Sequence, residues 1–257
     1  MINQLKESLR WMHGTGNRFA IIDRSELTGV DDTELARALG GSVDGLLVLH
    51  PGDESSDLVM QVVNADGSRA EMCGNGLRCI AVDAYRRGIV RGRTIRIRVG
   101  AHVAMARVRD GSSHEPVVHV RMPSPKIVSK SDHLHVDLGN EHGVFIRESV
   151  PNEDEWGGEV QRLHDRGLQE LNLHVVHVLD PGHVEMRSWE RGSGPTSACA
   201  SGATAVVSAL ASCEQVSSIV RVSQPGGELL VKWRGSGRQP VNIGQVGLLP
   251  VPLKEGA

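Results

Sequence analysis

Two of the four cysteines stand directly before segments that suit helices, and both open a Cys-x-x-Gly pattern: Cys73-Gly74-Asn75-Gly76 and Cys199-Ala200-Ser201-Gly202. The start of a helix carries unpaired backbone N–H groups and the positive end of the helix dipole, and both favour thiolate over thiol. The same N–H groups can bind an anion, so two such helix starts facing each other across a cleft could hold one carboxylate. A thiol would then flank the neighbouring carbon on each side. One cysteine could remove a proton from that carbon and the other could return one to the opposite face, which inverts a stereocentre without a cofactor.

A purely structural role or a metal-binding role suits these two cysteines less well. A single cysteine near a helix start is more often a small buried hydrophobic residue than a base, but two cysteines at matched positions favour chemistry. Zinc is disfavoured, because Cys73 and Cys79 lack zinc-ligand spacing, as do Cys199 and Cys213, and no histidine is close to Cys199 in sequence. We therefore expect no metal and interpret Cys79 and Cys213 as structural. A disulfide between Cys73 and Cys199 could form on oxidation and would inactivate such a site.

Each candidate cysteine precedes one helix within a series of strands. Residues 77–87 form the first predicted helix, which Gly88 can end in a left-handed conformation, and the small, apolar residues 201–211 form the second. The polar stretch 152–167 also suits a helix. Alternating or β-branched residues predict strands at residues 18–22, 45–50, 57–63, 94–99, 103–109 and 116–122, and then at residues 134–138, 172–179, 183–190, 219–223, 228–233 and 241–246.

The chain also carries an internal repeat. Met72-Cys73-Gly74-Asn75-Gly76 aligns with Ala198-Cys199-Ala200-Ser201-Gly202, and the order of elements around them matches. Met122-Pro123-Ser124-Pro125 breaks the strand periodicity and is typical of a linker. We therefore predict an α+β protein of two pseudo-symmetric, β-rich halves, residues 1–122 with Cys73 and residues 123–257 with Cys199.

The composition is that of a folded protein with no nucleic-acid or membrane partner. The 257 residues include 28 Lys and Arg against 31 Asp and Glu, with 39% hydrophobic and 23% charged residues, which excludes extended disorder. The apolar runs are far shorter than the roughly 20 residues of a membrane-spanning helix, and residues 1–7 lack the apolar core of a secretory signal. The alternating arginines of residues 91–98 are interpreted as a solvated face. We expect a cytoplasmic protein that acts on a small molecule.

The sequence resembles the diaminopimelate epimerase family over nearly its whole length. The residues similar to the signature of that family are Asn64-Ala65-Asp66-Gly67-Ser68-Arg69-Ala70-Glu71-Met72-Cys73-Gly74-Asn75-Gly76-Leu77-Arg78-Cys79. Three further motifs resemble its opening motif, its second-half motif and a late strand: Met12-His13-Gly14-Thr15-Gly16-Asn17, Trp189-Glu190-Arg191-Gly192-Ser193-Gly194 and Pro225-Gly226-Gly227-Glu228-Leu229.

The resemblance implies a fold and an activity. Each half would be a curved, mostly antiparallel sheet around a central helix, with the active site in the cleft between the halves. The activity would be that of an isomerase, a cofactor-independent (PLP-independent) amino-acid epimerase that interconverts LL- and meso-2,6-diaminopimelate for lysine and peptidoglycan precursor biosynthesis. Cys73 and Cys199 would be its catalytic cysteines, and the protein would be a homodimer.

The resemblance also assigns roles to matching residues. Gly74, Asn75, Ser201 and Gly202 would supply backbone donors to the reacting carboxylate. The residues that would hold the rest of the substrate are Asn17, Asn64, Asn140, Asn172, Glu190 and Arg191. Arginine can bind a carboxylate in bidentate fashion, while carboxylate and amide oxygens accept from ammonium. His142 would support the site and, with Glu190, set which thiol is deprotonated.

Four positions depart from the family pattern. Arg18 replaces the usual Asp, Glu141 the usual Pro, Pro195 the usual Glu and Ala200 the usual Gly. Arg18 reverses a charge, Pro195 removes a backbone donor, and Ala200 adds a methyl group where the backbone should approach the carboxylate. We expect these changes to alter the rate or the substrate range.

Three alternatives remain open on the sequence. The chain could be a related cofactor-independent racemase of another amino acid such as histidine or proline, although Arg191 and the asparagines favour a substrate with a charged distal end. It could be a binding protein that holds a carboxylate without turnover. It could also be a thiol-redox protein, which would catalyse disulfide exchange.

Overall fold

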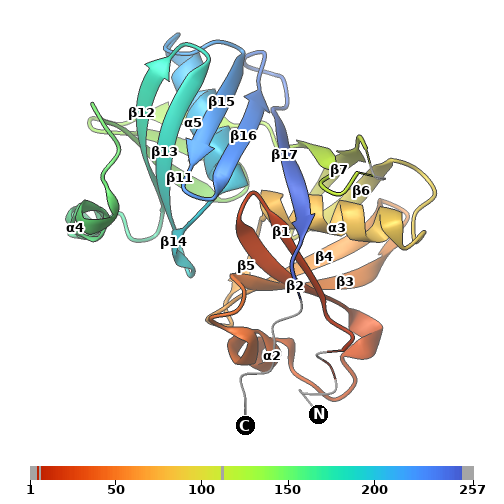
Figure 1. Ribbon diagram of the computed structural model, residues 1–257. Helices are drawn as coiled ribbons and strands as arrows, with labels where there is room; N and C mark the ends of the chain where they lie inside the picture. Colours follow the sequence, from red (N-terminus) through yellow and green to blue (C-terminus); the bar gives the residue numbers. More distant parts are fainter. Residues whose placement is uncertain (1–4, 6, 111–112, 251–257) are drawn as a thin grey trace.

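The chain folds as strands wrapped around two buried helices (Figure 1). The structure is a computed structural model that describes residue 5 and residues 7–110 and 113–250, so part of the segment considered as a secretory signal lies outside the described residues. The helices are η1 (Arg24–Glu26), α2 (Asp32–Leu39), α3 (Gly74–Arg86), α4 (Glu153–His164) and α5 (Ala200–Ser212). Within the described residues, none of these helices is long and apolar enough to cross a membrane.

The strands follow in two series. The first comprises β1 (Arg10–Gly14), β2 (Asn17–Asp23), β3 (Gly45–Asp53), β4 (Ser56–Asn64), β5 (Arg69–Ala70), β6 (Thr94–Val99), β7 (His102–Val108) and β8 (Val117–Arg121). The second comprises β9 (Lys126–Ser129), β10 (Leu134–Asp137), β11 (Glu141–Ile146), β12 (Asn172–Asp180), β13 (His183–Glu190), β14 (Gly194–Thr196), β15 (Ile219–Gln224), β16 (Gly227–Lys232) and β17 (Val241–Leu248).

The strand pairings of the first series recur in the second. β2 pairs with β3 and β4 with β6 in parallel, while the β1–β2, β3–β4, β6–β7 and β7–β8 pairs are antiparallel. In the same order, β11 pairs with β12 and β13 with β15 in parallel, while the β10–β11, β12–β13, β15–β16 and β16–β17 pairs are antiparallel. The predicted α+β fold of two pseudo-symmetric, mostly antiparallel halves is therefore confirmed.

The last strand, β17, joins the two series. It pairs with β16, where Leu230 lies opposite Ile243, and with β8, where Val120 lies opposite Asn242. Its far end pairs with β1. In Figure 1, β17 runs from the sheet around α5 down into the lobe around α3. The segment 122–125, predicted as a linker, lies between β8 and β9 and outside any strand.

Helices α3 and α5 each fill the interior of one series. In α3, Leu77 and Ile80 are fully buried and belong to one apolar cluster with Ile95 and Ile97 of β6. In α5, residues 200–210 are all buried, and their small side chains allow the surrounding strands to approach closely. Burying one large aliphatic side chain contributes roughly 1.5–3 kcal/mol, so these helices are held mainly by apolar packing.

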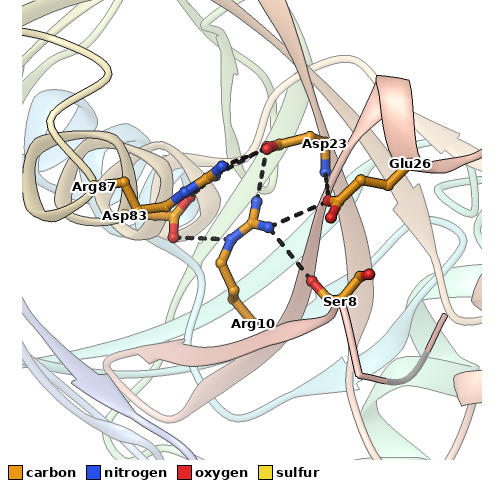
Figure 2. Close-up of polar contacts among 6 residues, drawn as sticks. All are labelled: Ser8, Arg10, Asp23, Glu26, Asp83 and Arg87. Atoms are coloured by element: carbon orange, nitrogen blue, oxygen red, sulfur yellow. Dashed lines mark hydrogen bonds and ion pairs between the residues drawn. The ribbon is translucent and has the colours of Figure 1, made fainter. Parts of the chain in front are cut away.

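A charged network fixes the far end of α3 (Figure 2). Asp83 lies in the last turn of the helix and Arg87 is its C-cap residue, and Asp83 accepts from Arg10 of β1 at 3.0 Å and from Arg87 at 3.2 Å. Asp23, at the end of β2, binds both Arg10 and Arg87. Burial raises the pKa of Asp83, against the two guanidinium groups, which lower it. The network ties the C-terminal end of α3 to β1 and β2, opposite the end that carries Cys73.

Several elements were not predicted from the sequence: β1, η1, α2, β5, β9, β11 and β14. α2 is a surface helix whose apolar stripe is limited to Leu35, Ala36 and Leu39, although Asp31 caps its N-terminus. β11 opens with Glu141-His142-Gly143, in which glycine and glutamate are poor strand formers. Tertiary pairing with β10 and β12, rather than local propensity, makes this segment a strand.

We predict that Ile80→Ala lowers the free energy of unfolding by about 2–5 kcal/mol, because it leaves a cavity in the core around α3. Ile89→Ala is the matched control, since this isoleucine follows the same helix and is 44% exposed; its effect should stay within about 0.5 kcal/mol. Urea denaturation of both variants measures the difference. Equal losses would contradict the packing described for α3.

Candidate functional site

The two candidate cysteines occupy the same position at the starts of α3 and α5. Each is the residue that caps its helix in an extended conformation, with φ of -146° for Cys73 and -123° for Cys199. The Cys73 thiol accepts from the N–H of Gly76 at 3.2 Å, and the Cys199 thiol accepts from the N–H of Gly202 at 3.2 Å. The repeat found in the sequence is therefore a repeat of local geometry.

The two helix starts touch each other. A Cβ atom placed on Gly74 would lie 2.7 Å from the Cβ of Ala200, so glycine is required at position 74 by this contact. The methyl group of Ala200 thus points toward the start of α3. The methyl group that departs from the family pattern therefore lies in the contact between the two helices. The fold brings together the segments around Cys73 and Cys199, which are far apart in sequence.

Asn75 links these segments directly. Its side-chain amide donates to the backbone carbonyl of Ala198 at 2.8 Å and makes a longer contact of 3.4 Å with the carbonyl oxygen of Asn17. The backbone N–H of Cys199 donates to the side chain of Gln224 at 2.8 Å, a partner that the sequence did not suggest. Both cysteine segments are therefore held by buried amide side chains.

Burial dominates the electrostatics of both thiols. It raises the pKa of Cys73 to about 12, with the Glu190 carboxylate adding to the rise and the N–H of Gly76 opposing it. It also raises the pKa of Cys199 well above its usual value, again with Glu190 adding to the rise. The N–H groups at the helix starts lower the pKa of both thiols, in the expected direction, but desolvation has the larger effect and raises it. In this arrangement both thiols are protonated at neutral pH.

Glu190 lies next to Cys199. The hydroxyl of Thr196 donates to its carboxylate at 2.6 Å, and the Cys199 thiol is a second hydrogen-bond partner. Burial raises the pKa of Glu190. The Glu190 carboxylate is therefore close enough to both thiols to raise their pKa values and favour their protonated forms.

Asn64 and Asn172 approach the segment around Arg191 from two elements. The backbone N–H of Arg191 donates to Asn172 at 3.1 Å. Gly192 is close to Asn64, since a Cβ on this glycine would lie 3.1 Å from the Asn64 amide nitrogen. The side chain of Arg191 is 47% exposed and its guanidinium lies 3.9 Å from Glu170, so it can turn toward a ligand.

His142 and His174 form a buried hydrogen-bonded pair. His142 contacts Asn140 at 3.0 Å and His174 at 2.8 Å, and His174 contacts Ser188 at 2.9 Å. Burial lowers the pKa of His142 to about 3 and that of His174 as well, so both rings are neutral. A neutral chain of this kind fixes the side-chain orientation of Asn140.

His174 connects this pair to the second cysteine. A Cβ on Gly202 would overlap the His174 ring, so the ring lies directly against the residue whose N–H binds the Cys199 thiol. His174 was not predicted from the sequence, because a lone histidine inside a strand gives no signal of its own. In the described residues, His142 is connected to the Cys199 segment through its hydrogen bond to His174, whose ring packs against Gly202.

The remaining departures have local partners. The backbone N–H of Arg18 donates to Asp44 at 2.7 Å, and the Asn17 amide donates to the same carboxylate at 3.0 Å. Asp44 thus supplies a carboxylate beside Arg18, which was not predicted from the sequence. Glu141 pairs with His135 at 2.7 Å, and Pro195 lies opposite Trp189 in the β13–β14 pair. Within the described residues, no group of three or more His, Cys, Asp or Glu side chains is arranged to hold a metal ion.

Sequence comparisons relate this chain to one family of known proteins. A family profile described as diaminopimelate epimerase matches residues 10–128 and 134–249. A diaminopimelate epimerase from Methanothermobacter thermautotrophicus is 32% identical, with 86% of this chain and 88% of that protein covered. One from an Azoarcus species is 34% identical, with 91% and 93% covered.

Solved structures share the fold at low sequence identity. A phenazine biosynthesis protein from Bacillus anthracis has a TM-score of 0.71 at 13% identity, covering 94% of this chain and 96% of its own. A probable proline racemase from Agrobacterium radiobacter has a TM-score of 0.68 at 13% identity, covering 96% and 93%. These similarities concern the fold. The family match and the identities above place this chain in the diaminopimelate epimerase family.

Proposed function

We propose that this chain interconverts LL- and meso-2,6-diaminopimelate by proton transfer between two cysteines, without a cofactor. The observation that carries the proposal is that Cys73 and Cys199 cap two helices whose starts touch at Gly74 and Ala200. In this proposal the α-carbon of the substrate lies between the two thiols, with one thiol on each face. Lysine and peptidoglycan precursor biosynthesis is the role that follows from this reaction.

The reaction requires one thiolate and one thiol. The thiolate removes the α-proton from one face, and the opposite thiol gives its proton to the other face, so the thiol and thiolate exchange roles in each turnover. First-turn N–H groups of Gly74, Asn75, Ser201 and Gly202 are the proposed donors to the α-carboxylate, on which negative charge develops. The Gly202 N–H, which donates to the Cys199 thiol in this structure, would be shared between the thiol and the carboxylate. The α-ammonium group of the substrate brings a positive charge beside the thiols, which lowers the pKa that burial has raised.

The distal end of the substrate is assigned to the remaining polar residues. Arg191 can bind the distal carboxylate, and Asn64 and Asn172 contact the segment that carries it. The side-chain carbonyl oxygen of Asn140 is hydrogen-bonded to His142, so its amide N–H groups are the atoms that can donate to a carboxylate. Glu190 can accept from an ammonium group, and Asn17 is placed beside Asn75.

Further expectations concern the whole protein. We propose that residues 1–122 and 123–257 act as two halves that close around the substrate and exclude water, with β17 as the shared strand. A cytoplasmic location and a homodimeric state remain part of this proposal. Histidine or proline as substrate is not favoured, because the family match is to diaminopimelate epimerases and the likeness to a proline racemase concerns the fold.

The direct test replaces each thiol. Cys73→Ala and Cys199→Ala should each lower kcat on LL-diaminopimelate by about 10²–10⁴-fold, since each removes one acid/base group. Chiral chromatography of the two isomers measures the conversion. Cys213→Ala is the matched control, because this cysteine is exposed beyond α5, and it should keep the wild-type rate.

The same experiment separates the alternatives. A binding protein would show no turnover in the wild type and unchanged ligand affinity in both variants. A redox protein would catalyse thiol–disulfide exchange and lose that activity in the variants. Full epimerase activity in either variant would contradict the two-thiol reaction.

The pH dependence of thiol reactivity tests the role of Glu190. Because this carboxylate raises the pKa of both thiols, Glu190→Gln should lower it and increase the thiolate fraction at any given pH. In the free enzyme, alkylation of Cys73 by iodoacetamide should rise with pH in both proteins. The rising limb should lie at lower pH in Glu190→Gln, with a severalfold faster reaction near pH ~9.

Mass spectrometry of the alkylated peptides gives these rates without substrate, so a loss of substrate binding in the variant does not affect them. Glu185→Gln, on the same strand β13, is the control and should leave the profile in place. An unchanged or slower reaction in Glu190→Gln would show that this carboxylate does not govern the thiols.

A further inference from the structure

Arg78, in the second turn of α3, is a fully buried guanidinium whose partners are neutral oxygens. It donates to Asn75 at 2.6 Å, to Asn242 of β17 at 2.8 Å and to the hydroxyl of Thr15 at 3.0 Å. Within the described residues it forms no ion pair with a carboxylate, and its Nε has no hydrogen-bond partner. Burial lowers its pKa to about 10. A buried cation without a carboxylate partner is costly, so its position calls for a role beyond stability.

The two asparagines that bind Arg78 also donate hydrogen bonds to the backbone on either side of the second cysteine. The amide of Asn75 donates to the carbonyl of Ala198 at 2.8 Å, and the amide of Asn242 donates to the carbonyl of Ala200 at 3.2 Å. These carbonyls belong to the residues directly before and after Cys199. Because arginine only donates, it fixes both asparagines with their oxygens toward the guanidinium and their N–H groups toward the two carbonyls.

The surroundings of Arg78 are built for this side chain. Gly14 of β1 and Gly244 of β17 both lie against it. A Cβ on Gly244 would be 3.0 Å from its guanidinium carbon and 2.5 Å from Leu229, so this glycine makes room for both side chains. Thr15 has a φ of 56°, a left-handed conformation that β-branched residues rarely adopt, and it directs its hydroxyl to Arg78. Glycines of two strands therefore leave space for the guanidinium, and the left-handed backbone of Thr15, between β1 and β2, directs a hydroxyl toward it.

We propose that Arg78 is a positioning residue that clamps the Cys199 segment to the start of the helix that carries Cys73, and so sets the separation of the two thiols. The clamp consists of Arg78, Asn75 and Asn242. The inference rests on the proposed function, in which both thiols must flank one carbon. A lysine could keep the charge but could not bind two asparagine oxygens in the fixed geometry of the guanidinium fork.

The test compares two arginine-to-lysine substitutions on one helix. Arg78→Lys should lower kcat by about 100-fold with little change in KM, since a displacement of about 1 Å at a reacting group costs about that much. Arg87→Lys is the control, because Arg87 lies at the opposite end of α3 in the network of Figure 2; it should lower stability without lowering kcat. Thermal unfolding confirms that both variants are folded at the assay temperature.

A double-mutant cycle tests whether Arg78 acts through Asn242. Asn242→Ala removes one arm of the clamp and should also lower kcat. If both residues act through the same clamp, the loss in the double variant should fall well short of the product of the single losses. Losses that simply multiply would overturn the proposal.

A second readout needs no turnover. Cys199 is 2% exposed, and release of its segment should raise its alkylation by iodoacetamide by about tenfold in Arg78→Lys and Asn242→Ala but not in Arg87→Lys. If the wild type does not epimerise diaminopimelate, the proposed function is wrong. The alkylation rate of Cys199 still tests the clamp in that case, because it does not depend on turnover. Wild-type reactivity of Cys199 in both clamp variants, or an equal rise in Arg87→Lys, would overturn it.

Discussion

The contact between the starts of α3 and α5 is the constraint on which the rest of the structure depends. Gly74 and Ala200 touch, so the segments that carry the two capping cysteines are held together by the packing of two buried helices. Each helix is enclosed by its own series of strands, and the repeated pairings make the two enclosures equivalent. The strand β17 and the Asn75 amide then fix one enclosure against the other.

Burial at this contact has two opposing effects. It removes water from the reacting centre, which strengthens every charge interaction with a bound substrate. It also raises the pKa of Cys73 and Cys199, and the Glu190 carboxylate adds to that effect, so the free enzyme favours two neutral thiols. A substrate that brings its own ammonium group changes this balance. The thiolate would therefore form mainly where the substrate is bound.

The sequence was enough to predict what is encoded locally or by repetition. The Cys-x-x-Gly repeat located both helix starts, and alternation located strands such as Thr94–Val99. The sequence could not reveal contacts between distant positions. Examples are Asp44 beside Arg18, His174 against Gly202, and Arg78 bound to Asn242 across 164 positions. A prediction from helix position alone also overstates the preference of the thiols for the thiolate form. Desolvation opposes that preference, and the degree of burial follows from tertiary packing, which the sequence does not show.

The proposed reaction needs two separate groups that act on opposite faces of one carbon. The most direct measurement is proton NMR and mass spectrometry of LL-diaminopimelate in D₂O at low conversion. With two acid/base groups, the meso product carries deuterium at the inverted carbon while the remaining LL substrate keeps its hydrogen. A single group acting on both faces would place deuterium in recovered substrate as fast as in product, and that result would contradict the two-thiol reaction.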